Sequence, residues 1–148
     1  MAMKRHGIQL NINGVDHDID IDARRTLVDA IRDKCGMTGT HIGCEHGVCG
    51  ACTVLVDDVP VRACLMFAVQ ASGLKIRTVE GLATNGEYSA LQQAFHDHHA
   101  LQCGFCTPGM LMLSTWLVER GGPITDDELR EVVASNLCRC TGYQNILK

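Results

Sequence analysis

The spacing of the cysteines constrains the fold of this chain more than any other feature of its sequence. The chain has 148 residues and nine cysteines, and eight of the nine fall into two groups. An odd number of cysteines argues against a framework of paired disulfides, so the groups point to metal binding or redox chemistry. The first group consists of Cys44, Cys49, Cys52 and Cys64, and the second of Cys103, Cys106, Cys138 and Cys140.

The first group has the spacing C-x4-C-x2-C, and Cys64 follows after eleven further residues. This spacing is typical of the loop that holds a [2Fe–2S] cluster in plant-type ferredoxins. Gly43, Gly47 and Gly50 lie among these cysteines and allow the backbone to wrap closely around a cluster. Structural zinc is the alternative, because four cysteines can also bind zinc, but zinc sites commonly combine two separated C-x2-C pairs. One continuous loop therefore favours iron and sulfur.

The second group combines a C-x2-C pair with a C-x-C pair farther along the chain. Residues 108–120 and 126–136 both show the apolar spacing of a helix. If these two helices pack antiparallel, the start of the first lies beside the end of the second, and all four cysteines meet. The positive end of the first helix dipole would then face an anionic cluster. The spacing alone leaves zinc and iron–sulfur equally open at this site.

The first half of the chain alternates apolar and polar residues in the manner of strands around one helix. Asn13-Gly14 predicts a two-residue hairpin turn. Thr26 is expected to cap the helix, and Gly36 to end it. The pattern predicts a compact α+β domain over residues 1–80. Strands are expected over residues 8–12, 15–21, 53–56, 59–63 and 75–79.

The second half of the chain shows helical spacing throughout. Residues 81–88 contain glycine, threonine and asparagine with few apolar side chains, which is typical of a linker. Residues 89–148 therefore predict a separate, all-α domain. The expected starts of its helices are Ser89, Thr107 followed by Pro108, Thr125 with Glu128 as a capping box, and Thr141.

Charge and hydropathy exclude several classes of partner. The formal net charge of -4 gives no reason to expect nucleic acid binding, which usually needs a basic patch. No apolar run reaches the length of a membrane span. Residues 1–7 lead directly into alternating polar residues, with neither a secretory nor a twin-arginine signal, so we expect a cytoplasmic protein. In that compartment, many cysteines favour metal or redox chemistry over disulfides.

Three segments of the sequence resemble one known family. Residues 43–53 (GCEHGVCGACT) are similar to the loop that holds the first cluster in small iron–sulfur subunits of the xanthine oxidase family. Residues 102–109 (QCGFCTPG) and 136–143 (NLCRCTGY) resemble the motifs of the second cluster in the same subunits. Glu80-Gly81-Leu82 matches the segment between their two domains. The three motifs occur in the same order as in the family and span nearly the whole chain.

This resemblance implies both a fold and a role. The fold would be an N-terminal β-grasp, plant-type ferredoxin-like domain followed by an all-α, four-helix-type domain, each with its own [2Fe–2S] cluster. Such subunits have no substrate site. They assemble with a large molybdopterin-binding subunit and a medium FAD-binding subunit, as a dimer of heterotrimers, and relay electrons from molybdopterin to FAD during hydroxylation or dehydrogenation. By the same resemblance, Gln102 and Cys140 contact the pterin, which some relatives bind in a dinucleotide form, and Cys140 also binds iron.

Two further features lie outside these motifs. Cys35, the ninth cysteine, falls at the end of the first predicted helix and is interpreted as a small buried apolar side chain. The tract His96-Asp97-His98-His99 resembles a metal site, but its members scatter around a helix axis, so we interpret it as a solvated helix face. The substrate and the final electron acceptor of the complex are not encoded in this chain.

Overall fold

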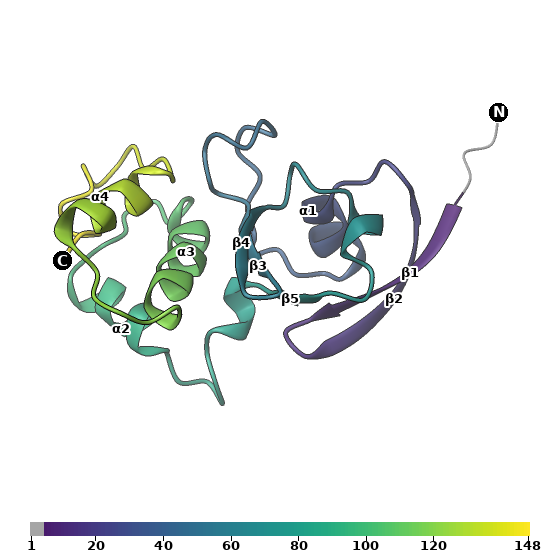
Figure 1. Cartoon of the computed structure of the whole chain (residues 1–148), viewed down its shortest axis with the longest axis horizontal. Helices are drawn as coiled ribbons and strands as arrows, with labels where there is room; N and C mark the ends of the chain where they lie inside the picture. Colours follow the sequence, from purple (N-terminus) through teal and green to yellow (C-terminus); the bar gives the residue numbers. More distant parts are fainter. Residues whose placement is uncertain (1–4) are drawn as a thin grey trace.

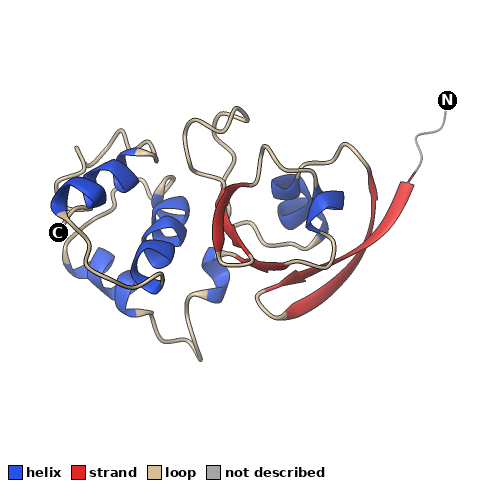
Figure 2. Ribbon diagram, in the orientation of Figure 1, coloured by secondary structure: helices blue, strands red, loops and turns tan. Residues whose placement is uncertain are grey.

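The first two strands form a long hairpin (Figures 1 and 2). The computed structural model describes residues 5–148, and β1 (Arg5–Ile12) pairs antiparallel with β2 (Val15–Asp22) along their full length. Asn13 and Gly14 between them have φ angles of 53° and 81°, the left-handed values that a type I′ turn requires. The predicted hairpin turn is therefore confirmed.

Five strands make one mixed sheet in the order β2-β1-β5-β3-β4. The other strands are β3 (Thr53–Val56), β4 (Val59–Arg62) and β5 (Lys75–Arg77). Strand β5 pairs parallel with β1 and antiparallel with β3. The last strand is shorter than predicted and ends at Arg77, because the N–H of Thr78 bonds to the side-chain oxygen of Asn13 (2.9 Å) instead of a strand. The chain then leaves the sheet through the 3-10 turn η3 (Val79–Gly81).

A short helix packs on the sheet and completes the first core. It begins as α1 (Leu27–Asp29), continues as the π-helical turn η1 (Ala30–Lys34), and is followed by Gly36 at φ +71°. The Thr26 hydroxyl accepts a hydrogen bond from the Asp29 N–H (3.2 Å), as predicted for its N-cap. A 3-10 turn, η2 (Ala68–Ala71), lies between β4 and β5. With aromatics at only 4% of the chain, the core is aliphatic. Fully buried members are Leu10, Ile12, Leu27, Ile31 and Val54.

The part of the chain from residue 82 onward contains three α-helices among the described residues. They are α2 (Ala90–Asp97), α3 (Thr107–Glu119) and α4 (Asp126–Ala134). The hydroxyls of Ser89 and Thr125 cap α2 and α4, as expected. The predicted capping box at Thr125 forms only in part, because the Glu128 carboxylate pairs with Arg120 (2.5 Å).

Two predicted helix starts are wrong. The helix α3 begins one residue earlier than expected, since the N–H of Met110 bonds to the carbonyl of Cys106 (3.0 Å) and Cys106, not Thr107, is the N-cap. The helix expected from Thr141 is replaced by a turn over residues 142–146. Gly142 and Tyr143 have φ angles of 62° and 67°, which a right-handed helix cannot contain.

Helix α3 connects the two halves of the molecule by lying against β3 (Figure 1). Leu55 of β3 is fully buried in the core of the helical half, where it packs with Phe95, Leu111 and Met112. Sheet and helices therefore share one interface through β3. Among residues 5–148, we find no helix long and apolar enough to cross a membrane.

Candidate metal centres

Three cysteines of the first group, Cys44, Cys49 and Cys52, lie in the loop between η1 and β3. Glu45, Gly47 and Gly50 all have positive φ angles, which curl this loop. The curl directs the backbone N–H groups of His46 and Cys49 toward the Sγ atom of Cys44, at 3.3 and 3.4 Å. Hydrogen bonds from the N–H of Cys49 and then of His46 lower the pKa of Cys44 to about 6. Cys44 is therefore mostly thiolate at neutral pH, the form that binds metals.

The hairpin β3–β4 returns the fourth cysteine to the same loop. The N–H of Ala63 bonds to the carbonyl of Cys52 (3.2 Å), so the adjacent Cys64 faces Cys52, and both thiols are buried. Burial, followed by the neighbouring Cys64 and Cys49, raises the pKa of Cys52 to about 11. The thiols of Cys44 and Cys49 also interact directly. The structure thus brings together all four cysteines that were predicted as one group.

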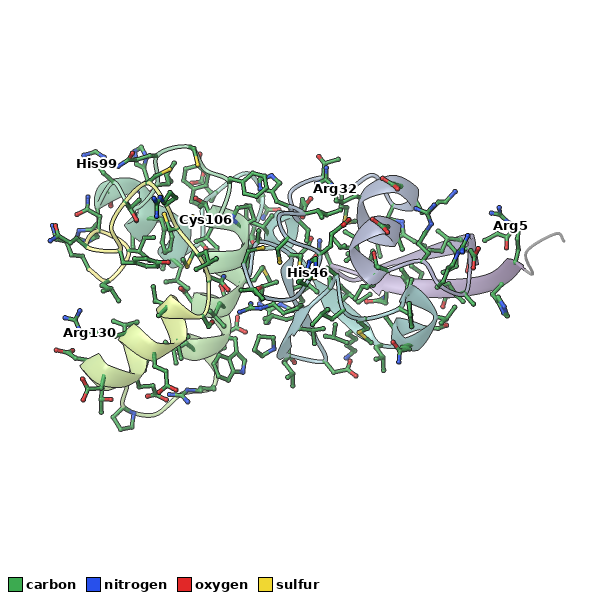
Figure 3. All side chains as sticks on the ribbon, turned by 90° about the horizontal axis from the view of Figure 1, so that it is seen from above. Arg5, Arg32, His46, His99, Cys106 and Arg130 are labelled. Carbon is green, nitrogen blue, oxygen red and sulfur yellow. The ribbon has the colours of Figure 1, made fainter. Side chains whose placement is uncertain are left out.

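The second group joins the start of α3 to the segment after α4. The Sγ atoms of Cys103 and Cys140 are 3.5 Å apart, and the thiols of Cys106 and Cys138 interact beside them. Cys103 and Cys140 are exposed, whereas Cys106 and Cys138 are half-buried. In Figure 3, the labels of His46 and Cys106 mark the two cysteine loops, which come from separate halves of the ribbon. The predicted meeting of the C-x2-C and C-x-C pairs is therefore present in the structure.

The second group is split into thiols with raised and lowered pKa values. Burial and then the neighbouring Cys138 raise the pKa of Cys106 to about 12, and the Cys103 thiol raises the pKa of Cys140. The N–H of Phe105 lowers the pKa of Cys103. At Cys138 burial acts upward, but hydrogen bonds from the hydroxyl and N–H of Thr141 outweigh it and lower the pKa. The thiols of the second group thus interact in two pairs, Cys103 with Cys140 and Cys106 with Cys138.

The two groups meet at the interface between the halves. The N–H of Leu137 donates a hydrogen bond to the carbonyl of Cys49 (2.8 Å). On another side, the ring of His41 stacks on Phe105 at 4.9 Å, and His41 Nδ1 lies 2.8 Å from the Phe105 carbonyl oxygen. Each contact joins one cysteine loop to the other. Neither was predicted from the sequence, since each depends on how the two halves pack.

Three buried polar atoms near the cysteines have no hydrogen-bond partner in the protein. They are the hydroxyl of Thr107, which follows Cys106, and both side-chain atoms of Asn136, which packs against Gly50. Buried polar atoms normally have partners, so the two unpaired donors, the Thr107 hydroxyl and the Asn136 amide nitrogen, fit a site that an acceptor-rich group completes. Within residues 5–148, no group of three or more His, Cys, Asp or Glu side chains is placed to hold a metal ion. The thiols interact in pairs and two buried donors beside them are unpaired, which fits a cluster with several iron and sulfur atoms better than a single metal ion.

The remaining predicted residues occupy less specialised positions. Gln102 is exposed beside Cys103, on the rim of the second group. Cys35 is half-buried and packs against the first core, and burial raises the pKa of its thiol, as expected for a packing residue. His96 through His99 are exposed, as expected, but α2 ends at Asp97, so His98 is its C-cap and His99, with a φ angle of 51°, lies beyond the predicted helix face.

Comparisons with known proteins agree with this geometry. Residues 10–74 match the family described as "2Fe-2S iron-sulfur cluster binding domain", and residues 78–148 match the "[2Fe-2S] binding domain" family. The chain is 55% identical to the caffeine dehydrogenase subunit gamma of Pseudomonas sp. (strain CBB1), over 98% of this chain and 89% of that protein. It is 44% identical to the xanthine dehydrogenase iron-sulfur-binding subunit of Escherichia coli O157:H7, over 95% of this chain and 89% of that protein.

A solved structure shows the same similarity in three dimensions. Quinoline 2-oxidoreductase from Pseudomonas putida 86 superimposes with a TM-score of 0.93 and 50% identity, over 97% of this chain and 88% of that chain. At this identity, the match extends beyond a shared fold. The protein therefore has two [2Fe–2S]-binding domains and belongs to the small iron–sulfur subunits of the xanthine oxidase family of molybdenum hydroxylases.

Proposed function

We propose that this chain relays electrons through two [2Fe–2S] clusters, from molybdopterin on a large subunit to FAD on a medium subunit. The observation that carries the proposal is the direct hydrogen bond from Leu137 to Cys49, which joins the two cysteine groups. A structural module has no need for such a junction, whereas a relay needs its two centres close and fixed. Each cluster would take up and pass on one electron at a time.

We assign all eight clustered cysteines as iron ligands. The assignment rests on the convergence of each group and on the N–H donors that surround Cys44. Such donors stabilise the negative charge of a cluster and tune its reduction potential. The first cluster would be held by Cys44, Cys49, Cys52 and Cys64, and the second by Cys103, Cys106, Cys138 and Cys140.

The pterin would approach the exposed rim of the second group. Gln102, Cys103 and Cys140 are exposed together at this rim, so a cofactor on a partner subunit could reach the Gln102 amide and the Cys140 sulfur. Phe105 and Leu137 are 48% and 55% exposed beside it. Apolar side chains around a redox centre are typical of a surface that a partner covers. We therefore place the large, molybdopterin-binding subunit on this side.

The loop of the first group has its own apolar surroundings. Val48 and Leu65 are 65% and 63% exposed, and Leu65 lies against Gly47. We propose that the medium, FAD-binding subunit covers this surface, and that the assembly is a dimer of heterotrimers. We also propose a cytoplasmic location, because a reducing compartment keeps so many thiols free for iron.

The finer description of the fold follows from the same assignment. We propose that residues 1–80 form a β-grasp, plant-type ferredoxin-like domain, supported by a mixed sheet with one short helix packed on it. Residues 81–88 would be the linker, and residues 89–148 a four-helix-type domain in which the turn at 142–146 takes the place of a short helix. No substrate site is proposed on this chain.

The complex would act on a nitrogen-containing heteroaromatic substrate. Relatives of this chain carry the names caffeine dehydrogenase, xanthine dehydrogenase and quinoline 2-oxidoreductase, and all three named compounds are of this class. The proposed substrate class is tested by measuring the turnover of such compounds by the assembled complex and comparing it with the turnover of aliphatic aldehydes at the same concentration. Faster turnover of the aldehydes would contradict it.

Iron analysis and EPR of the dithionite-reduced protein test the relay itself. We expect about four irons per chain and two distinct S = 1/2 signals, one for each [2Fe–2S] cluster. Zinc without an EPR signal would instead identify a structural zinc module. About two irons with one signal would remove one of the two cysteine assignments.

A further inference from the structure

We propose that the hydroxyl of Tyr143 is a positioning group for electron transfer between the two clusters. It would fix the segment 136–138, which connects the second cluster to the first. The inference rests on the relay proposed above and adds to it a residue that is not an iron ligand. Its structural basis is one side-chain oxygen that makes hydrogen bonds on both sides of Leu137.

The hydroxyl of Tyr143 acts as both acceptor and donor. Its oxygen accepts a hydrogen bond from the N–H of Cys138 (2.9 Å) and donates one to the carbonyl of Asn136 (3.1 Å). These two backbone groups belong to the residues before and after Leu137, so the hydroxyl bridges the backbone across that residue. Holding the residues before and after Leu137 limits the directions in which its own N–H can point.

Tyr143 itself is held in an uncommon conformation. Its φ angle is +67°, a left-handed value that bulky residues rarely adopt. Its ring packs against the core of the helical half, and its N–H bonds to the Thr141 hydroxyl (3.1 Å). Such a conformation persists only where the surroundings over-determine it, and it commonly marks a functional position. The packed ring and strained backbone aim the hydroxyl at the segment 136–138.

The fixed segment reaches the loop of the first cluster. With both neighbours held, the Leu137 N–H donates to the carbonyl of Cys49 (2.8 Å). Cys49 would bind the first cluster and Cys138 the second, so one hydrogen bond and a short stretch of backbone connect the two sites. One electron would leave the reduced second cluster and reduce the oxidised first cluster, with no proton transferred. Electron transfer through bonds and hydrogen bonds is faster than across a gap, so movement of this segment would slow it.

The side chain of Asn136 fixes the other face of the segment. A Cβ carbon at Gly50 would stand 2.9 Å from the Asn136 Cα atom, so only glycine permits this approach. Asn136 is 1% exposed. The segment is therefore confined by Gly50 on one side and by Tyr143 on the other. Loss of the hydroxyl would leave the ring in place and release only the Tyr143 side.

The test is Tyr143→Phe in the complex assembled with its partner subunits. The change keeps the ring and removes both hydrogen bonds, and the Cys138 N–H becomes free to turn toward cluster sulfur. We expect a more positive reduction potential for the second cluster, since hydrogen bonds to sulfur favour the reduced state, with the first cluster unchanged. Electron arrival at the first cluster, followed by rapid-freeze EPR after reduction through molybdenum, should slow by about tenfold or more.

The matched control is Tyr88→Phe, because Tyr88 is the other tyrosine of the chain and is 65% exposed in the linker. It should match the wild type in both measurements. Should Tyr143→Phe lose its iron, incorporation of 3-fluorotyrosine at position 143 provides a milder change. This residue keeps both hydrogen bonds but makes the hydroxyl a stronger donor and a weaker acceptor, so it should shift the potential of the second cluster alone.

The possible results distinguish a failure of the positioning role of Tyr143 from a failure of the proposed electron relay. Two cluster signals in the wild type, with potentials and transfer rates unaltered by both changes at position 143, would overturn the positioning role and leave the relay standing. Equal shifts at both clusters would also overturn it, because they would indicate a general structural effect. Absence of cluster signals from the wild type would overturn the relay itself.

Discussion

Gly109, in the first turn of α3, lies directly against Gly50 in the loop of the first cysteine group. A Cβ carbon at position 109 would stand 2.3 Å from the carbonyl oxygen of Gly50 and 3.2 Å from the Cα atom of Ala51. Helix and loop therefore touch backbone to backbone. This contact sets the distance between the two groups, because Cys106 is the N-cap of the same helix.

Replacement of Gly109 by alanine should push α3 away from the loop. The obstructing atoms belong to backbone, which cannot rotate aside, so we expect the free energy of unfolding to fall by about 1–3 kcal/mol. Urea denaturation of the iron-loaded protein measures this loss. Gly7→Ala is the control, because a Cβ carbon there meets nothing within 4 Å. Equal stability of the two variants would contradict the close contact.

The ion pair between Arg77 and Glu119 should contribute a small, pH-dependent stabilisation. Arg77 of β5 donates two hydrogen bonds to the Glu119 carboxylate, at 2.6 and 2.8 Å, which lower the pKa of Glu119. The side chains are 34% and 48% exposed, so solvent screens the pair, and Glu119→Gln should cost less than about 1 kcal/mol. Glu131→Gln, an exposed change on α4, is the control.

The sign of the pH dependence follows from the direction of this shift. The pKa of Glu119 is lower in the folded than in the unfolded state, so the stabilisation is complete above the unfolded value of about 4.3. It is lost as the pH falls through the folded pKa. The stability difference between wild type and Glu119→Gln should therefore persist from pH 7 to pH 5 and vanish in stronger acid. Urea is the suitable denaturant, because guanidinium salts screen the pair. A difference that grows on acidification would contradict this account.

Local signals predicted the parts of the fold in which neighbouring residues determine the conformation. The hairpin at Asn13-Gly14 and the caps at Thr26 and Ser89 each depend on side chains within three residues, and all three are confirmed. The end of β5 does not depend on near neighbours. The side-chain oxygen of Asn13 accepts a hydrogen bond from the N–H of Thr78, 65 residues away in the sequence, and no local pattern indicates this contact.

The candidate site also has one feature that the sequence predicts and one that it does not. The meeting of the second cysteine group could be predicted, because helical spacing and antiparallel packing place the start of α3 beside the end of α4. The junction between the groups could not be predicted. It depends on the Leu137 N–H and the Cys49 carbonyl, which are backbone groups that every residue type except proline could supply.

Removal of the iron should leave thiols of very different reactivity in the first group. With a pKa of about 6, Cys44 is about 90% thiolate at pH 7, whereas a thiol like Cys52, with a pKa of about 11, is about one part in ten thousand thiolate. Brief treatment with iodoacetamide at pH 7 should therefore label Cys44 well before Cys52, as read by peptide mass spectrometry.

Two conditions check the origin of this selectivity. At pH 5 the thiolate fraction of Cys44 falls about tenfold, so its labelling should slow by a similar factor. In urea the loop no longer directs N–H groups at Cys44, so labelling of Cys44 and Cys52 should become equal. Earlier labelling of Cys52 in the folded, iron-free chain would contradict the proposed role of these N–H groups.

Single cysteine replacements should remove the two clusters independently. Cys64 lies at the end of the β3–β4 hairpin in the sheet half, and Cys106 lies at the start of α3 in the helical half. We expect Cys64→Ala to abolish the EPR signal of the first cluster and Cys106→Ala that of the second, with about half of the iron retained in each case. Cys35→Ala should retain all of the iron, because Cys35 belongs to neither cysteine group, although it packs against the core that contains Cys52 and Cys64. Loss of both signals in either ligand variant would contradict independent clusters, because it would show that the shared interface governs cluster retention. Loss of iron in Cys35→Ala would require a new assignment of the first ligand set.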